Sequence, residues 1–216
     1  MTLLALQMRT VLALTAALLA PGLQTPSLVG LWDSATTSSG GIGSTLEFRA
    51  DGTFVEATTV IVNAFYRATG GRLVIAERPI AAQAPADMSV RIEVEGDVLR
   101  WTGPDGSIVR KERLGRPEAG QPPIVGAWRY RHDTGTTAFE RFTDDGRMFF
   151  RLPMKSWVGR YVLKGSELVL TRPNQADVVM QIVLRSDDLS LASGGRTTTY
   201  RRDHAGSWYD RERIVR

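Results

Sequence analysis

The chain contains no cysteine, and only two of its 216 residues are histidine. Without cysteine there can be no disulfide scaffold, thiolate metal site or cysteine nucleophile. The histidines, His132 and His204, lie in non-equivalent places, whereas a zinc site needs three or four converging ligands. Stability must therefore come from core burial, and we expect neither a metal nor a cofactor.

Catalytic motifs are also missing. No Gly-x-Ser-x-Gly elbow accompanies His132, so a nucleophilic relay is not expected there. The glycine-rich stretch 38–43 lacks the lysine of a phosphate-binding loop. The neighbouring carboxylates Asp144 and Asp145 precede a glycine, which is typical of a turn. We therefore predict no catalytic residue and a protein that is not an enzyme.

The charge is only mildly basic. The chain has 27 Lys and Arg against 23 Asp and Glu, a formal net charge of +4, and the two signs alternate along it. Arg110, Lys111, Arg113 and Arg116 form the densest basic cluster. A nucleic-acid-binding protein would be expected to gather such charge in one stripe. We expect this cluster to be solvated charge at a strand end, and nucleic acid is not an expected partner.

One long apolar run occurs near the N-terminus, at residues 11–20, and Pro21 follows it. This pattern predicts a secretory signal peptide over residues 1–25. The run is too short to span a membrane comfortably, since a transmembrane helix needs about 20 apolar residues. We expect export to the periplasm or the cell exterior, with no membrane span after signal removal. The alternative is a buried N-terminal helix.

The rest of the chain contains an internal repeat. Shifting the sequence by about 90 to 96 positions aligns landmarks in the same order, which indicates duplication. The matching segments are 29–32 with 125–128, 48–52 with 142–146, Tyr66 with Tyr161, and 92–99 with 182–189. We assign repeat 1 to 28–114, a Pro- and Gly-rich linker to 115–123, repeat 2 to 124–203 and a tail to 204–216.

Each repeat has the period-two hydrophobic alternation of a half-buried antiparallel sheet. Turn dipeptides such as Asp51-Gly52 separate the apolar runs. Their spacing predicts about eight short strands per repeat. The fold is therefore expected to be all-β, with two tandem up-and-down barrels. Ser207 and Asp210 in the tail resemble a helix capping box, which is compatible with a short C-terminal helix.

The Gly-x-Trp at each repeat start, the Phe-x-x-Asp-Gly hairpin and the arginine near each repeat end resemble bacterial lipocalin-like domains. In that family the motif tryptophan packs beneath an arginine from the last strand. The resemblance therefore implies that Trp32 pairs with Arg110 and Trp128 with Arg201, while Gly30 and Gly126 belong to the same motif. If the repeats do not close separately, they would form one composite barrel instead.

Aromatic residues recur at strand positions that would line one inner face. They are either a packed core or the wall of an apolar ligand pocket. Glu140 shares the face of Phe142, where a carboxylate would line a wet cavity or an open face. The candidate ligand-binding residues are Phe48, Phe54, Tyr66, Trp101, Glu140, Phe142, Phe150 and Tyr161. We expect a non-enzymatic binding module for a small apolar ligand; the alternative is a protein-interaction or inhibitor protein with solid barrels.

Overall fold

The computed structural model describes residues 27–80, 89–117 and 119–203. The predicted signal peptide and the predicted C-terminal helix lie outside these residues, so both stay predictions. Within the described ranges, no helix has the length and apolar character needed to cross a membrane.

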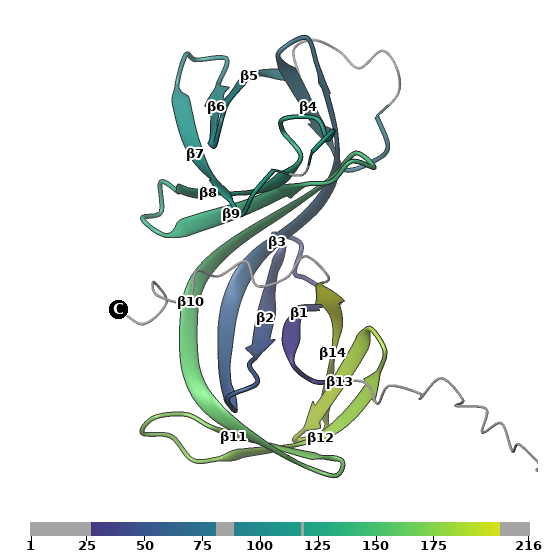
Figure 1. Ribbon diagram of the computed structural model, residues 1–216. Helices are drawn as coiled ribbons and strands as arrows, with labels where there is room; N and C mark the ends of the chain where they lie inside the picture. The colour runs from purple at the N-terminus through teal and green to yellow at the C-terminus, as the bar shows by residue number, and fades with distance from the viewer. Residues whose placement is uncertain (1–26, 81–88, 118, 204–216) are drawn as a thin grey trace, which may run out of the picture.

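The described chain is an antiparallel meander of 14 strands, which confirms the all-β prediction. Each strand pairs with its neighbours in sequence, and β1 pairs with β14 to close the circuit (Figure 1). The strands are β1 Gly30–Ser34, β2 Ile42–Phe48, β3 Thr53–Thr69, β4 Arg72–Ala76, β5 Ser89–Glu95, β6 Val98–Thr102, β7 Ile108–Leu114, β8 Gly126–Arg131, β9 Thr137–Phe142, β10 Arg147–Lys164, β11 Glu167–Thr171, β12 Val178–Arg185, β13 Asp188–Ser193 and β14 Arg196–Asp203.

A second pairing, between β3 and β10, crosses the middle of this circuit. It runs from Arg147 opposite Phe65 to Arg160 opposite Thr53. The pairing divides the circuit into two closed rings that share these two strands (Figure 1). The central ring consists of β3 through β10. The terminal ring consists of β1, β2, β3 and β10 through β14.

Neither repeat closes on itself. Strand β1 of repeat 1 pairs with β14 of repeat 2, and β7 of repeat 1 pairs with β8 of repeat 2. Each ring therefore takes strands from both repeats. The pairing does not show one barrel per repeat over 28–114 and 124–203. Both rings combine strands of the two repeats, whereas the alternative was a single composite barrel.

The two shared strands also change the expected strand count. In the described ranges each repeat has seven strands, whereas about eight were expected, since β1 to β7 come from repeat 1 and β8 to β14 from repeat 2. The segment 57–63 has no turn glycine or proline and is rich in β-branched residues, so β3 continues through it. In β10, a register shift between Pro153 and Lys155 accommodates the proline.

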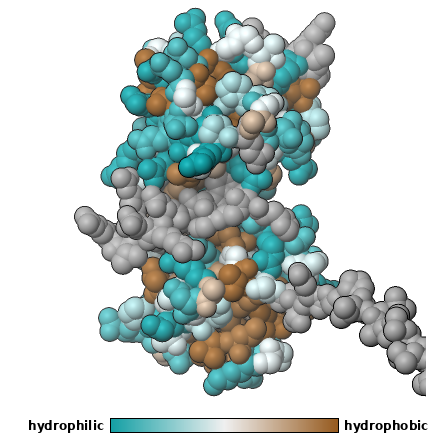
Figure 2. Space-filling view, in the orientation of Figure 1, coloured by the Kyte–Doolittle hydropathy of each residue, from teal (hydrophilic) through white to brown (hydrophobic). Residues whose placement is uncertain are grey.

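Each ring encloses its own apolar cluster. In the terminal ring, Trp32, Phe48 and Phe54 lie at the centre and are at most 1% exposed. In the central ring, Trp128 and Phe142 are buried to the same extent. Apolar side chains lie within the outline of both rings in the space-filling view (Figure 2). The inward faces of the strands therefore form two cores.

The outer walls of the rings meet at a waist. Leu31 from β1 and Phe139 from β9 are buried there in one apolar cluster, and Leu114, Ala127 and Phe149 pack against it. Arg151 of β10 donates from Nε to Asp33 Oδ2 of β1 at 2.9 Å, and from Nη1 to Asn63 Oδ1 at 2.9 Å. Burial raises the pKa of Asp33, and Arg151 opposes that rise. Buried apolar and ionic contacts thus join the two rings.

Candidate functional site

The Gly-x-Trp motif builds the same closure in both rings. Trp32 donates its indole N–H to the carbonyl of Leu28 at 2.8 Å, and Trp128 donates to the carbonyl of Ile124 at 2.8 Å. Both tryptophans are 0% exposed. The indole N–H of each buried ring is therefore satisfied by the chain segment just before its strand.

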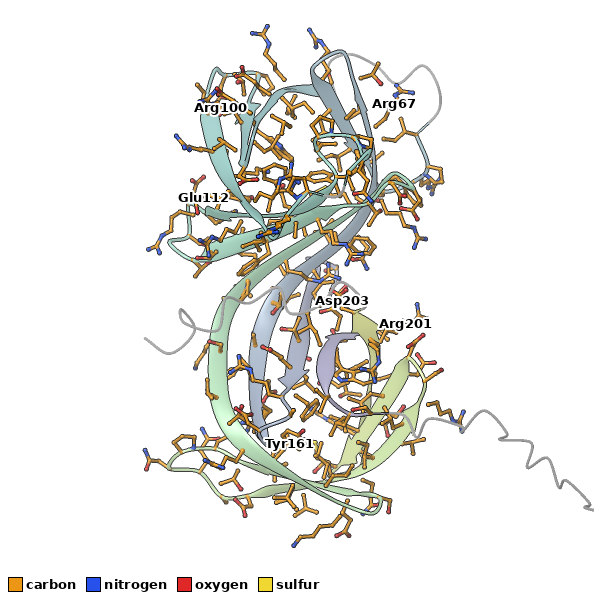
Figure 3. All side chains as sticks on the ribbon, viewed as in Figure 1. Arg67, Arg100, Glu112, Tyr161, Arg201 and Asp203 are labelled. Carbon is orange, nitrogen blue, oxygen red and sulfur yellow. The ribbon has the colours of Figure 1, made fainter. Side chains whose placement is uncertain are left out.

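An arginine stacks on each of these tryptophans, but the pairs differ from those that the resemblance implies. The guanidinium of Arg202 lies 4.0 Å from the Trp32 ring centroid, and that of Arg113 lies 4.0 Å from Trp128. Arg110 and Arg201 point outward and are exposed. Figure 3 labels Arg201 on β14, where its side chain leaves the ring. The expected cation–π contacts thus form, but with Arg202 and Arg113 in place of Arg201 and Arg110.

Each of these arginine–tryptophan contacts joins residues of different repeats. Trp32 of repeat 1 receives Arg202 of repeat 2, while Trp128 of repeat 2 receives Arg113 of repeat 1. The glycine of each motif makes room for the arginine. A Cβ at Gly30 or Gly126 would lie 2.7 Å from the arginine Nη1, and their φ angles are +135° and +129°. The motif glycine is therefore required by both space and backbone conformation.

The repeated tyrosines make a second crosswise contact. Tyr66 donates its hydroxyl to the carbonyl of Thr143 at 2.7 Å, and Tyr161 donates to the carbonyl of Arg49 at 2.8 Å. Each acceptor belongs to the Asp-Gly hairpin of the other repeat. Tyr161 lies in the terminal ring in Figure 3. The duplicated landmarks thus meet their counterparts from the other half of the chain.

The candidate ligand-binding residues divide between the two rings instead of forming one site. Phe48, Phe54 and Tyr161 belong to the terminal cluster. Their rings contact one another, with the Phe48 and Tyr161 centroids 5.0 Å apart. The rest lie in the central ring, on strands that converge there: Tyr66, Trp101, Glu140, Phe142 and Phe150.

A buried ion pair occupies the central ring. Lys111 Nζ of β7 donates to Glu140 Oε2 of β9 at 2.5 Å, and the two side chains are 1% and 2% exposed. The ammonium lies 3.0 Å from the Trp101 ring centroid and 4.6 Å from that of Tyr130. Tyr130 also hydrogen-bonds to Glu140. Glu140 is therefore buried and paired, not on an open face, and Lys111 is not solvated strand-end charge.

Burial controls the acid–base properties of this group. It lowers the pKa of Lys111 to about 8, against the opposing attraction of Glu140. It raises the pKa of Glu140, against the opposing effects of Lys111 and Tyr130. It also raises the pKa of Tyr130. The low-dielectric surroundings thus disfavour every charged form, and the pair contacts offset part of that cost.

The central ring also contains an unsatisfied donor and a partly accessible lining. Trp101 Nε1 is buried and has no hydrogen-bond partner among the described residues. Apolar side chains packed against the central cluster are only partly buried: Tyr66, Ala68, Ile75, Val90, Ile92, Val94, Trp101 and Phe150. Since these residues face inward, their exposed surface lies at the mouth or inside the ring.

The corresponding positions in the terminal ring are different. Glu140 lies opposite Trp128 in the sheet, and Leu46 lies opposite Trp32. In the same way, Lys111 lies opposite Leu99 and Tyr200 lies opposite Leu189. The buried Lys111 of the central ring therefore corresponds to Tyr200 of the terminal ring, and the buried Glu140 corresponds to Leu46.

The terminal ring contains an acidic group nearer to solvent. Glu56 accepts a hydrogen bond from Arg172, and the two side chains remain 24% and 20% exposed. Tyr200 accepts a hydrogen bond from Ser44 at 3.1 Å. The terminal interior is thus polar at its edge, whereas the central ring holds its ion pair in the core.

Sequence reasoning missed Lys111 and Tyr130. Period-two alternation places Val109, Lys111 and Arg113 on the same face of a strand, and that face points inward. This alternation could have predicted that Lys111 is buried. Charge composition alone placed Lys111 in the basic cluster. Tyr130 follows the motif Trp128 by two residues and so shares its inward face.

Other candidate sites remain weak. His132 lies just after β8, where its Nδ1 contacts Thr134 at 3.1 Å, and its hydrogen bonds to other described residues involve no carboxylate. Across the described ranges, no group of three or more His, Cys, Asp or Glu residues could hold a metal ion. The central ring, with its buried ion pair and a Trp101 N–H that is unpaired among the described residues, is therefore the best candidate site.

Comparison with known proteins returned no match among family models, curated proteins or solved structures. The lipocalin-like resemblance therefore stays a prediction that rests on the motif residues.

Proposed function

We propose that the protein is an exported, non-enzymatic binding module that holds a small, mostly apolar molecule in its central ring. The observation that carries this proposal is the buried Lys111–Glu140 pair. The same strand arrangement closes around Leu46 and Tyr200 in the terminal ring. The fold itself therefore does not require the ion pair.

The energetics support a role beyond stability. Replacing a buried ion pair by apolar residues of similar size is often neutral or stabilising by about 1 to 4 kcal/mol, because two charges must be desolvated. A pair retained at such a cost is a candidate for function, particularly where its pKa values are perturbed. Lys111 and Glu140 meet both conditions.

The lining of the ring supports the same proposal. Ligand sites in proteins are mainly apolar, with a few polar groups that orient the ligand. The partly exposed residues around Trp101 provide the apolar surface, and Lys111, Glu140 and Tyr130 provide the polar groups. Because Trp128 and Arg113 close one part of this ring, we expect entry near Trp101.

The test uses N-phenyl-1-naphthylamine, a neutral apolar fluorophore, with the full exported chain. Val90 and Met180 occupy matched inward positions, opposite Leu73 and Leu168 respectively. We expect Val90→Trp to fill the central ring and reduce fluorophore uptake by tenfold or more, while Met180→Trp leaves uptake unchanged. Circular dichroism melts check that both variants fold.

Loss of uptake with Met180→Trp alone would place binding in the terminal ring, and no uptake by the unmodified protein would remove the proposal. Native mass spectrometry of protein purified from its host supplies a second readout, since a co-purifying small molecule would support binding. N-terminal sequencing of the exported chain tests the export component separately.

A row of three valines, two of them exposed, favours a second candidate function, contact with a second copy of the protein. Val162, Val169 and Val179 lie side by side on β10, β11 and β12. Val162 is 52% exposed and Val179 is 51% exposed. If this row is an interface, Val162→Lys with Val179→Lys would abolish concentration-dependent association in sedimentation velocity and leave fluorophore uptake unchanged.

A further inference from the structure

We infer that the molecule held in the central ring is uncharged and presents an oxygen acceptor, of the ketone or ester carbonyl type, to the indole N–H of Trp101. This inference rests on the proposed function and adds the chemical class of the ligand. It follows from one unsatisfied donor and from the charge balance around it.

The donor is Trp101 Nε1. It is buried and has no acceptor among the described residues. The other two core tryptophans, Trp32 and Trp128, both donate to backbone carbonyls at 2.8 Å. Buried polar groups are nearly always hydrogen-bonded, and an unpaired one usually has a specific explanation. A ligand oxygen would satisfy Trp101 in the way that the chain satisfies the other two.

The position of Trp101 suits such a contact. It lies on β6 opposite Ile92 of β5 and Val109 of β7. Its side chain is partly exposed and packs against the central cluster, with its ring 6.4 Å from that of Phe142. An entering molecule would therefore meet apolar and aromatic surface before reaching the indole N–H.

The charge balance excludes an ion as the preferred ligand. Lys111 and Glu140 already neutralise each other at 2.5 Å, with almost no exposure. An added carboxylate or ammonium would leave one uncompensated charge in the dry interior, which is strongly unfavourable. Burial that lowers the pKa of Lys111 and raises that of Glu140 points the same way, since it disfavours net charge. A neutral acceptor satisfies Trp101 without this penalty.

The test compares three probes with one ring system: 2-acetylnaphthalene, 2-ethylnaphthalene and 2-naphthoate. Equilibrium dialysis at pH 7 measures each dissociation constant with the full exported chain. We expect 2-acetylnaphthalene to bind about fivefold more tightly than 2-ethylnaphthalene, the gain from one neutral hydrogen bond. We expect 2-naphthoate to bind more weakly than either.

Trp101→Phe removes the N–H and keeps an aromatic ring. It should abolish the preference for 2-acetylnaphthalene over 2-ethylnaphthalene while both still bind. Trp157→Phe is the matched control, because Trp157 lies on β10 opposite Glu56 in the terminal ring. It should leave all three constants unchanged. A downfield shift of the Trp101 indole proton on adding the ketone gives a direct spectroscopic readout.

The outcomes separate this inference from the proposed function. Equal binding of the ketone and the hydrocarbon, or an unchanged preference in Trp101→Phe, overturns the inference and leaves central-ring binding standing. Tightest binding of 2-naphthoate overturns the uncharged class. Failure of all three probes and of N-phenyl-1-naphthylamine overturns both. Loss of the preference only in Trp157→Phe would transfer the site to the terminal ring.

Discussion

The central and terminal rings are closed by the same motif and yet hold different interiors. Each has a motif tryptophan under an arginine from the other repeat, at 4.0 Å in both rings. The central ring then buries Lys111 and Glu140, whereas the terminal ring has Tyr200 and Leu46 at the matching positions. Since the shared closure is sufficient for the fold, the residues that differ are the ones to examine for function.

The largest expected effect comes from breaking the central pair. Lys111→Met or Glu140→Leu alone should lower the free energy of unfolding by about 3 to 5 kcal/mol, because each leaves one buried charge without its partner. The double variant should be as stable as the unmodified protein or more so. Urea denaturation measures all three.

The terminal ring supplies the control for that experiment. Tyr200→Phe removes one hydrogen bond to Ser44 and should cost only about 0.5 to 1.5 kcal/mol. If the double central variant were as unstable as the single variants, the pair would be structural, and the difference between the rings would lose its functional meaning.

A smaller effect tests whether the two closures are equivalent. Gly30→Ala and Gly126→Ala should each cost about 1 to 3 kcal/mol, because the backbone is in a region that side chains rarely adopt. The new Cβ would also displace the stacked arginine. Thermal denaturation followed by circular dichroism measures both.

Gly70→Ala is the matched control for the glycine variants. Its φ is +58°, and no atom lies within 4 Å of an added Cβ, so it reports the cost of backbone conformation alone. Comparable losses for Gly30→Ala and Gly126→Ala, both larger than that of Gly70→Ala, are expected. A loss confined to one ring would show that the closures contribute unequally.

The last expected effect, smaller than those of the charge and motif-glycine substitutions, is a pH dependence that only the central ring should produce. The pKa of Lys111 is lowered from 10.5 to about 8. Between these values the unfolded chain binds more protons than the folded one, so stability should rise with pH. From pH 8 to 9.5 the gain should be about 1 to 2 kcal/mol.

The double variant Lys111→Met with Glu140→Leu lacks this titration and provides the baseline. Urea denaturation at half-unit pH steps should show the rise in the unmodified protein and a flatter profile in the variant. Parallel profiles would mean that Lys111 does not titrate in this range, and that its ammonium is better solvated than its burial indicates.

Much of the local structure was predictable from the chain. Period-two alternation and Asp-Gly turns predicted the hairpins around residues 51 and 145, and both are present as β2–β3 and β9–β10. Trp32 and Trp128 make matching contacts, since each donates its indole N–H to the backbone carbonyl four residues before it. Local patterns succeed here because turn conformation and side-chain alternation depend on near neighbours.

The pairing of distant strands was not predictable in the same way. Two similar repeats can close separately or together, because either arrangement pairs the edge strands in an antiparallel sheet. The choice of Arg202 and Arg113 over Arg201 and Arg110 also depends on register, since a shift by one or three residues exchanges inward and outward side chains.

The sequence by itself determined the all-β class, because that class follows from alternation and turns, and it predicted an internal repeat from self-similarity. Only the tertiary structure decided which strands pair across the repeats and which charges are buried. Strand β7 of repeat 1 pairs with β8 of repeat 2, which in turn pairs with β9, and this order places Lys111 within reach of Glu140. That contact joins residues 29 positions apart. No local pattern encodes it, since it depends on how both repeats close around one interior.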